Sequence, residues 1–229
     1  MQGEFENALR ELGWKDRTIL LSGRTDTGVH ATGQVVSVDL DWAHADDELV
    51  RALNSLLPKD VVVRGAKAAR ATFHPRFDAV ARRYQYKVFH QPLRDPFRER
   101  FAWRVFPKFN AEALNTAAKH FLGTHDFSAF GSATSPKGTT VRTVTKAEWT
   151  QTQNDEWQFD VQADAFLYRM VRRMVFVQVA AAQGKFPADA IAEVLAKQPA
   201  AEKRSGFPSG LAPANGLTLV EVLYEESIK

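Results

Sequence analysis

Residues 23–31 place a carboxylate, a guanidinium and an imidazole within one short stretch that contains two glycines. Arg24 lies two positions before Asp26, and residues two apart in an extended chain face the same side. A neighbouring guanidinium favours the ionised carboxylate, which suits a nucleophile or an electrostatic stabiliser better than a general acid. His30 follows, and we expect it to position the loop rather than exchange protons. The alternative is a surface turn whose exposed Arg–Asp pair contributes about 0–1 kcal/mol.

Apolar runs on both sides of this loop predict the elements that hold it. We expect a helix over 3–13, strands over 17–22 and 33–40, a helix over 46–56 and a strand over 61–68. This order corresponds to a split βαβ unit without its opening strand. Residues 1–74 are therefore expected to form an N-terminal α/β half that carries the loop.

Residues 75–229 predict a second α/β half. His125-Asp126 within it is expected to be a structural motif at a helix end. The predicted elements, in chain order, are a strand over 76–90, a helix that Asn110 caps and Gly123 ends, strands over 140–152 and 156–163, helices over 166–183 and 187–197, and a strand over 217–223.

The composition limits the class of protein. With 45% hydrophobic and 25% charged residues, it is that of an ordinary soluble globular protein. The absence of cysteine excludes disulfides, thiolate metal sites and a cysteine nucleophile, and it fits a reducing cytoplasm. No apolar run reaches the roughly 18 residues that a membrane span needs, so none is expected.

Positive charge is concentrated between residues 75 and 108. This band holds nine Lys and Arg against three Asp and Glu, and aromatic residues lie between the arginines. Such a band can contact phosphates and stack on bases, which makes a nucleic acid a candidate partner. A solvated strand face whose aromatic side chains point into the core is the open alternative.

Six segments carry recognisable patterns in a fixed order. They read G-R-T-D-x-G-V-H-A over 23–31, R-x-Y-x-Y over 82–86, H-D-F-x-x-F over 125–130, T-x-R-x-V over 140–144, F-L-x-x-M-V-R over 166–172 and A-P-x-x-G-L over 212–217. Together they span nearly the whole chain and resemble the motifs of the TruA-type tRNA pseudouridine synthases. Several motifs in order are far more specific than one short match.

The resemblance implies an α+β protein with the pseudouridine synthase fold. Two ferredoxin-like or RRM-like halves would share a mainly antiparallel sheet flanked by helices. Members of the family begin with a strand bearing Y-D-G, which this sequence lacks. We expect that strand to have been lost through a late gene start or clipping, because a central strand leaves unpaired ladder groups when it is missing.

The implied activity is isomerisation of uridine to pseudouridine at positions 38, 39 and 40 in the anticodon stem-loop of tRNA. The family acts without a cofactor or metal, as a homodimer that binds one tRNA across both subunits. The enzyme would be cytoplasmic, with no membrane partner. The resemblance implies an isomerase of the intramolecular transferase type.

The resemblance also assigns site residues. Asp26 would be the nucleophile, and Arg172 would contact its carboxylate. Arg24 would pair with Asp26 or fill the space left by the flipped nucleotide, unless it serves only as a phosphate clamp. Tyr84 would stack on the uracil, with a core tyrosine as the alternative. The remaining candidates for binding the substrate are Arg82, Arg83, His30 and Arg169.

Other functions stay open on the residues alone. A non-catalytic RNA-binding module would keep the sheet and the basic band. A carboxylate hydrolase acting on a nucleoside or glycoside would need a second carboxylate as acid or base, and the loop motif offers none. Arg173 and Phe176 stand where the family usually has Asn and Gly, which leaves the local packing of that helix open.

Overall fold

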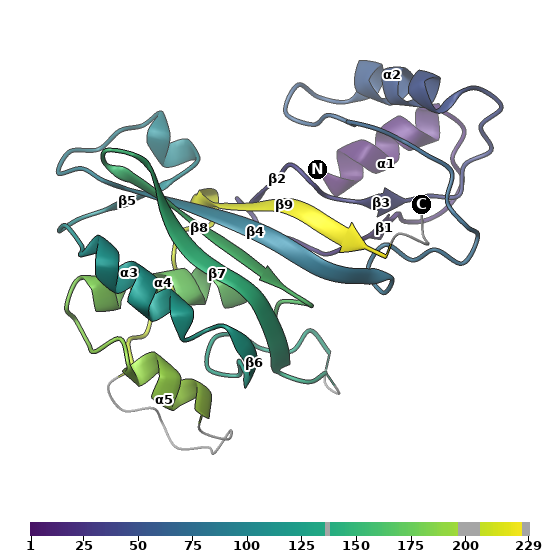
Figure 1. Cartoon of the computed structure of the whole chain (residues 1–229). Helices are drawn as coiled ribbons and strands as arrows, with labels where there is room; N and C mark the ends of the chain where they lie inside the picture. Colours follow the sequence, from purple (N-terminus) through teal and green to yellow (C-terminus); the bar gives the residue numbers. More distant parts are fainter. Residues whose placement is uncertain (136–137, 197–206, 226–229) are drawn as a thin grey trace. The chain divides into compact units, whose positions relative to one another are not determined.

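The computed structural model describes residues 1–135, 138–196 and 207–225, and its internal contacts divide the chain into two compact units (Figure 1). The first unit comprises Met1–Arg24, Val35–Ala79 and the chain from Tyr224 onward. The second comprises Thr25–Gln34 and Val80–Leu223. The segment from Thr25 to Gln34, expected in the N-terminal half, thus makes its contacts within the second unit.

The first unit contains two helices and a small sheet. Helices α1 (Gln2–Glu11) and α2 (Asp46–Leu56) confirm the two helices predicted there. Strands β1 (Leu20–Leu21) and β3 (Val36–Ser37) pair antiparallel, and each is far shorter than the predicted run. The helices bury their apolar faces in a cluster that includes Ala8, Leu9, Trp14, Ile19 and Leu53.

The strand predicted over 61–68 is wrong, because this stretch is described and forms no strand. A side chain takes the place of a neighbouring strand. The Asn54 amide donates to Val63 O over 2.9 Å, and Val63 N donates to Asn54 Oδ1 over 2.7 Å. The backbone groups of Val63 are therefore satisfied without a ladder.

The second unit is built on a seven-stranded sheet. It is mainly antiparallel, which confirms the α+β class, although β2 runs parallel to β9 and β5 runs parallel to β4. The strand order is β2 (His30–Ala31), β9 (Leu217–Tyr224), β4 (Ala79–His90), β8 (Glu156–Ala163), β7 (Val141–Gln153) and β6 (Gly123–Asp126), with β5 (Trp103–Val105) also on β4.

The expectation that His125-Asp126 ends a helix is wrong. Helix α3 (Ala111–Lys119) is capped by the Asn110 side chain as predicted, but it ends before Gly123. Gly123 has a φ of 101° and opens β6, in which His125 pairs with Arg142 of β7. The glycine therefore separates the helix from a strand that local periodicity did not reveal.

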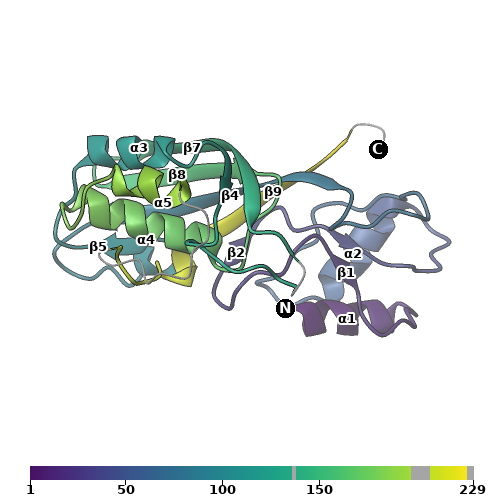
Figure 2. The same cartoon turned by 90° about the horizontal axis from the view of Figure 1, so that it is seen from below.

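Helices α3, α4 (Met170–Ala182) and α5 (Ala190–Ala196) cover one face of this sheet (Figures 1 and 2). The last of them is the helix predicted over 187–197, whose final residue lies outside the described residues. No helix of the described chain is both long and apolar enough to span a membrane.

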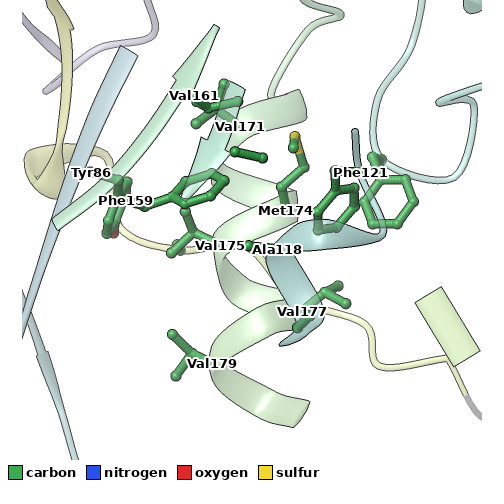
Figure 3. Packing of buried hydrophobic residues seen from close by; sticks show 14 of the residues in the cluster. Tyr86, Ala118, Phe121, Phe159, Val161, Val171, Met174, Val175, Val177 and Val179 are labelled. Carbon is green, nitrogen blue, oxygen red and sulfur yellow. The ribbon is translucent and has the colours of Figure 1, made fainter. Parts of the chain in front are cut away.

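Alternation along the strands separates the two faces of the sheet. Tyr86 of β4, with Phe159 and Val161 of β8, faces α4 and packs against Met174 and Val175 (Figure 3). The residues between them face the other way and are polar: Arg83 and Gln85 on β4, Lys146 and Glu148 on β7, and Asp160 on β8.

Helix α4 begins four residues later than predicted. Arg169 has a φ of 64°, a left-handed conformation that ordinary residues adopt rarely, and Met170 is the first helical residue. The apolar residues Phe166 and Leu167 therefore lie in an irregular segment that leads into the helix. The predicted C-terminal end holds, because α4 is followed by Gly184 with a φ of 72°.

Candidate active site

Asp26 and Arg172 form an ion pair although 146 positions separate them in the sequence. Nη1 of Arg172 donates to Oδ2 of Asp26 over 2.5 Å, and only 13% and 19% of the two side chains are exposed. Nε of the same guanidinium donates to the carbonyl oxygen of Ala212 over 2.8 Å. Two separate donors of one rigid group therefore fix its direction towards the carboxylate.

A tight turn presents the carboxylate. Val29 N donates to Asp26 O over 3.0 Å, and Gly28 between them has a φ of 85°. A side chain on Gly28 would be strained and would also lie 3.3 Å from the Cβ of Ala214. Val29 packs on the core of the second unit, and His30 then enters β2 beside β9. The loop is thus held at both its turn and its exit.

Tyr84 projects from β4 on the face covered by the helices. Its ring is half-buried and lies edge-on to Phe166, with 5.1 Å between the ring centroids. Burial raises the pKa of Tyr84 to about 12, the Arg82 charge opposes that shift and the Asp26 charge adds to it. The phenol therefore stays neutral and lies within electrostatic reach of the carboxylate. The ring also packs against the core while only partly buried, which is part of what the alternative of a core tyrosine expects.

The sheet separates two neighbouring arginines. Nη1 of Arg82 donates to Asp164 O over 2.9 Å at the end of β8. Arg83 faces the opposite side, where Nε and Nη2 donate to the two carboxylate oxygens of Asp160 over 2.7 and 2.5 Å. These hydrogen bonds raise the pKa of Arg83. Arg83 is therefore not brought together with Tyr84.

The imidazole of His30 makes a structural contact. Its Nε2 donates to Arg100 O over 3.0 Å, and its ring lies 4.9 Å from that of Phe101. Both contacts fix the loop exit against the segment that precedes β5. This geometry fits the expectation of a histidine that positions the loop.

Two other arginines of the predicted set have exposed side chains. Arg169 is exposed, and its guanidinium lies 4.7 Å from the ring centroid of exposed Tyr168. Arg24 is exposed and belongs to the first unit. Among the described residues, no three His, Asp or Glu side chains come together as metal ligands would.

Sequence reasoning assigned no role to the segment around Ala212, whose carbonyl oxygen receives the second hydrogen bond of Arg172. A signal was present in the A-P-x-x-G-L pattern. A Cβ on Gly216 would lie 2.7 Å from the Tyr86 ring, so this glycine marks a close approach of the segment to the sheet.

The comparisons with known proteins agree with the motifs. A family model described as tRNA pseudouridine synthase matches residues 117–225. Proteins named tRNA pseudouridine synthase A are 41% identical in Geobacillus kaustophilus, over 99% of this chain and 86% of the relative, and 38% identical in Bacillus subtilis, over 98% and 90%. The relative in Limosilactobacillus fermentum is 37% identical over 98% of this chain and 87% of its own length. By this similarity over nearly its whole length, the chain belongs to the family of TruA-type tRNA pseudouridine synthases.

Proposed function

We propose that this protein converts uridine to pseudouridine at positions 38, 39 and 40 in the anticodon stem-loop of tRNA, with Asp26 as the nucleophile. The ion pair between Asp26 and Arg172 beside neutral Tyr84 carries the proposal. Family membership supplies the reaction class, since the matched relatives are named as tRNA pseudouridine synthases.

The reaction needs little more than these groups. The bond between base N1 and sugar C1′ breaks, the freed uracil turns, and a bond from C5 to C1′ forms. The proton on C5 is lost and N1 gains one, so no oxidant, reductant or energy source is consumed. An ionised carboxylate supplies the nucleophile, and binding requires the target nucleotide to leave its stack.

Each of the surrounding side chains has a separate role in this proposal. Arg172 directs the carboxylate and balances its charge, because its guanidinium lies within hydrogen-bonding distance. Tyr84 offers an uncharged ring on which uracil stacks. Arg24 and Arg169, both exposed, contact the RNA backbone, and Arg82 does so from near the start of β4.

The proposal includes a homodimer that acts in the cytoplasm and binds one tRNA across both subunits. Sedimentation of the protein with and without tRNA measures this directly. A complex of two chains with one tRNA is the expected species. One chain per tRNA would remove the dimer from the proposal and leave the chemistry unaffected.

The test is incubation with unmodified tRNA followed by mapping of pseudouridine. Asp26→Ala and Asp26→Asn should both abolish product while the Kd for tRNA stays within a few fold. Asp41→Asn, which changes an exposed carboxylate of the first unit, is the matched control and should act normally.

Each other outcome has a definite meaning. A comparable rate in either Asp26 variant would remove that carboxylate from the chemistry. Product outside positions 38–40 would overturn the site assignment. Release of free uracil would indicate a hydrolase, and tRNA binding without any product would indicate a non-catalytic RNA-binding module.

A further inference from the structure

Residues 207–216 form a segment that contacts Arg172 and also the loop that carries Asp26, the two partners of the ion pair. Ala212, at 0% exposure, accepts from Nε of Arg172 over 2.8 Å and donates its own N–H to Arg172 O over 3.3 Å. Two positions later, Ala214 lies against the turn at Gly28 that presents Asp26. One short segment therefore bears on the guanidinium and on the loop that carries the carboxylate.

The segment is fastened to the sheet by Tyr86. The hydroxyl of Tyr86 donates to Pro213 O over 2.7 Å, and the side chain is fully buried. Burial holds the pKa of Tyr86 well above its ordinary value, so the hydroxyl keeps its proton and remains a donor. Gly216 leaves room for the ring, since a Cβ there would lie 2.7 Å from two of its carbons.

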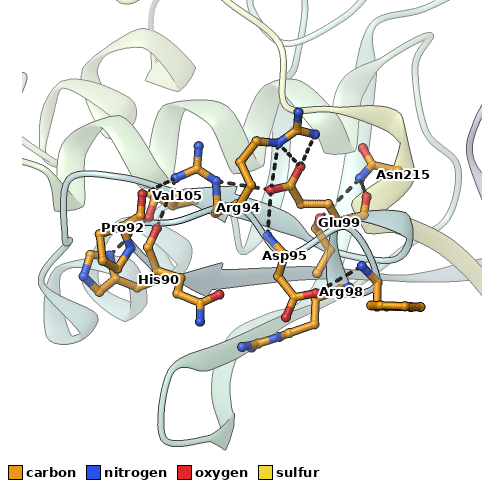
Figure 4. Close-up of polar contacts among 12 residues, drawn as sticks. His90, Pro92, Arg94, Asp95, Arg98, Glu99, Val105 and Asn215 are labelled. Atoms are coloured by element: carbon orange, nitrogen blue, oxygen red, sulfur yellow. Dashed lines mark hydrogen bonds and ion pairs between the residues drawn. The ribbon is translucent and has the colours of Figure 1, made fainter.

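Asn215 supplies a second fastening. Its side-chain amide donates to Glu99 O and, over 3.2 Å, to Ala102 O (Figure 4). The acceptor segment is itself held, because the carboxylate of Glu99 accepts from Arg94 over 2.7 Å. These bonds tie the segment to the connection between β4 and β5.

A third fastening lies upstream. Nη1 of Arg173 donates to Gly210 O over 2.8 Å. The ring of Phe176 lies directly against Gly210, whose φ is 148°, and a Cβ on that glycine would come within 2.2 Å of the ring. Residues of α4 that follow Arg172 thus contact the segment and hold it in place.

We propose that Tyr86 is a positioning residue for the isomerisation, acting through Pro213 and Ala212 on the guanidinium of Arg172. Because the guanidinium is planar and rigid, a carbonyl that fixes Nε also fixes the direction of Nη1 towards Asp26. Tyr86 touches neither the substrate nor the carboxylate in this assignment. The inference rests on the proposed function, in which that carboxylate is the reacting group.

The test uses Tyr86→Phe, which keeps the ring and removes one hydrogen bond. Tyr224→Phe is the matched control, because it removes a bond of the same kind, from a tyrosine hydroxyl to Pro75 O over 2.8 Å, in the first unit. Three quantities are measured: the single-turnover rate at saturating protein, the Kd for tRNA, and the exchange rate of the Arg172 Nε–H proton by NMR. The signal is assigned as the one that is missing from the spectrum of Arg172→Lys.

Tyr86→Phe should slow the single-turnover rate by about 10- to 100-fold, since small displacements of a reacting group can cost this much. The Kd for tRNA should change by less than about threefold, and the Nε–H proton should exchange faster with solvent. Tyr224→Phe should change none of the three. Asn215→Ala, which loosens the same segment elsewhere, should reproduce the pattern and serves if Tyr86→Phe does not fold.

A normal rate and normal Nε–H exchange in both Tyr86→Phe and Asn215→Ala would overturn the assignment, even with Asp26→Ala inactive. A weaker Kd with an unchanged rate would also overturn it, because the segment would then bind RNA. If the unaltered protein makes no pseudouridine, the proposed function fails. The exchange rate then still decides whether Tyr86 holds the guanidinium.

Discussion

Replacing Arg172 with alanine removes two hydrogen bonds from the second unit and leaves two acceptors without their donor. The Asp26 carboxylate, 19% exposed, loses its counter-charge. Breaking a fully buried pair costs about 3–5 kcal/mol, and partial access to water lowers this to about 1–2 kcal/mol here. The carbonyl of fully buried Ala212 loses its side-chain donor, which adds about 1–3 kcal/mol. The variant should therefore lose about 3 kcal/mol of stability.

The assay is equilibrium unfolding in guanidinium chloride, followed by tryptophan fluorescence, because buried Trp149 reports on the second unit. Arg172→Lys keeps the charge but lacks the planar fork, so it should recover only part of the loss. Adding Asp26→Asn to Arg172→Ala should restore about 1 kcal/mol, since the unpaired charge is then gone. A loss below about 0.5 kcal/mol in Arg172→Ala, or strict additivity of the two changes, would refute the reasoning.

Three further outcomes are expected. Asn110→Ala should lower the free energy of unfolding by about 1 kcal/mol in the same denaturant assay, because its side chain caps α3. Burial raises the pKa of Asp160, but hydrogen bonds from Arg83 and Gln85 lower it by more, so the pKa lies below its ordinary value of 3.8. The stability that this carboxylate contributes is therefore complete above pH 3.8 and is lost as the pH falls through the lowered pKa. Arg83→Leu should therefore move the acid-unfolding midpoint, measured by circular dichroism, to higher pH. Subtracting the ultraviolet titration of Tyr84→Phe from that of the unaltered protein should show no ionisation below about pH 11, as expected for a tyrosine with a pKa of about 12.

Long elements with local signals were predictable from the sequence. The helix over 46–56 has its apolar positions on one face, and the Glu48 carboxylate accepts from Ala45 N over 3.1 Å at its start. The strands β7 and β8 are long enough to show alternation, and a polar turn joins them. Alternation along β4 also separates Arg83 from Arg82 and Tyr84, so the sequence alone was enough to predict that Arg83 lies on the other face of the sheet.

Short elements depend on partners far along the chain and were not predictable. β2, β5 and β6 have two to four residues each, too few to show a period, and each exists because a longer strand offers free ladder groups. The stretch over 61–68 resembled a strand, but the Asn54 amide satisfies the backbone groups of Val63 within it instead. The pairing of Asp26 with Arg172 followed only from the resemblance, because no local pattern joins positions so distant.

The pairing of β2 with β9 has a consequence for how the protein matures. His30 pairs with Thr218, so the loop that carries Asp26 finds its place only after the last strand of the sheet has been added. Contacts between such distant segments form late, because closing a long loop costs conformational entropy. A chain emerging from the ribosome therefore displays the loop that carries Asp26 long before Arg172 and β9 have been made. The carboxylate of Asp26 therefore gains its partner Arg172, and its loop gains β9 as a neighbour, only after both distant segments have been synthesised.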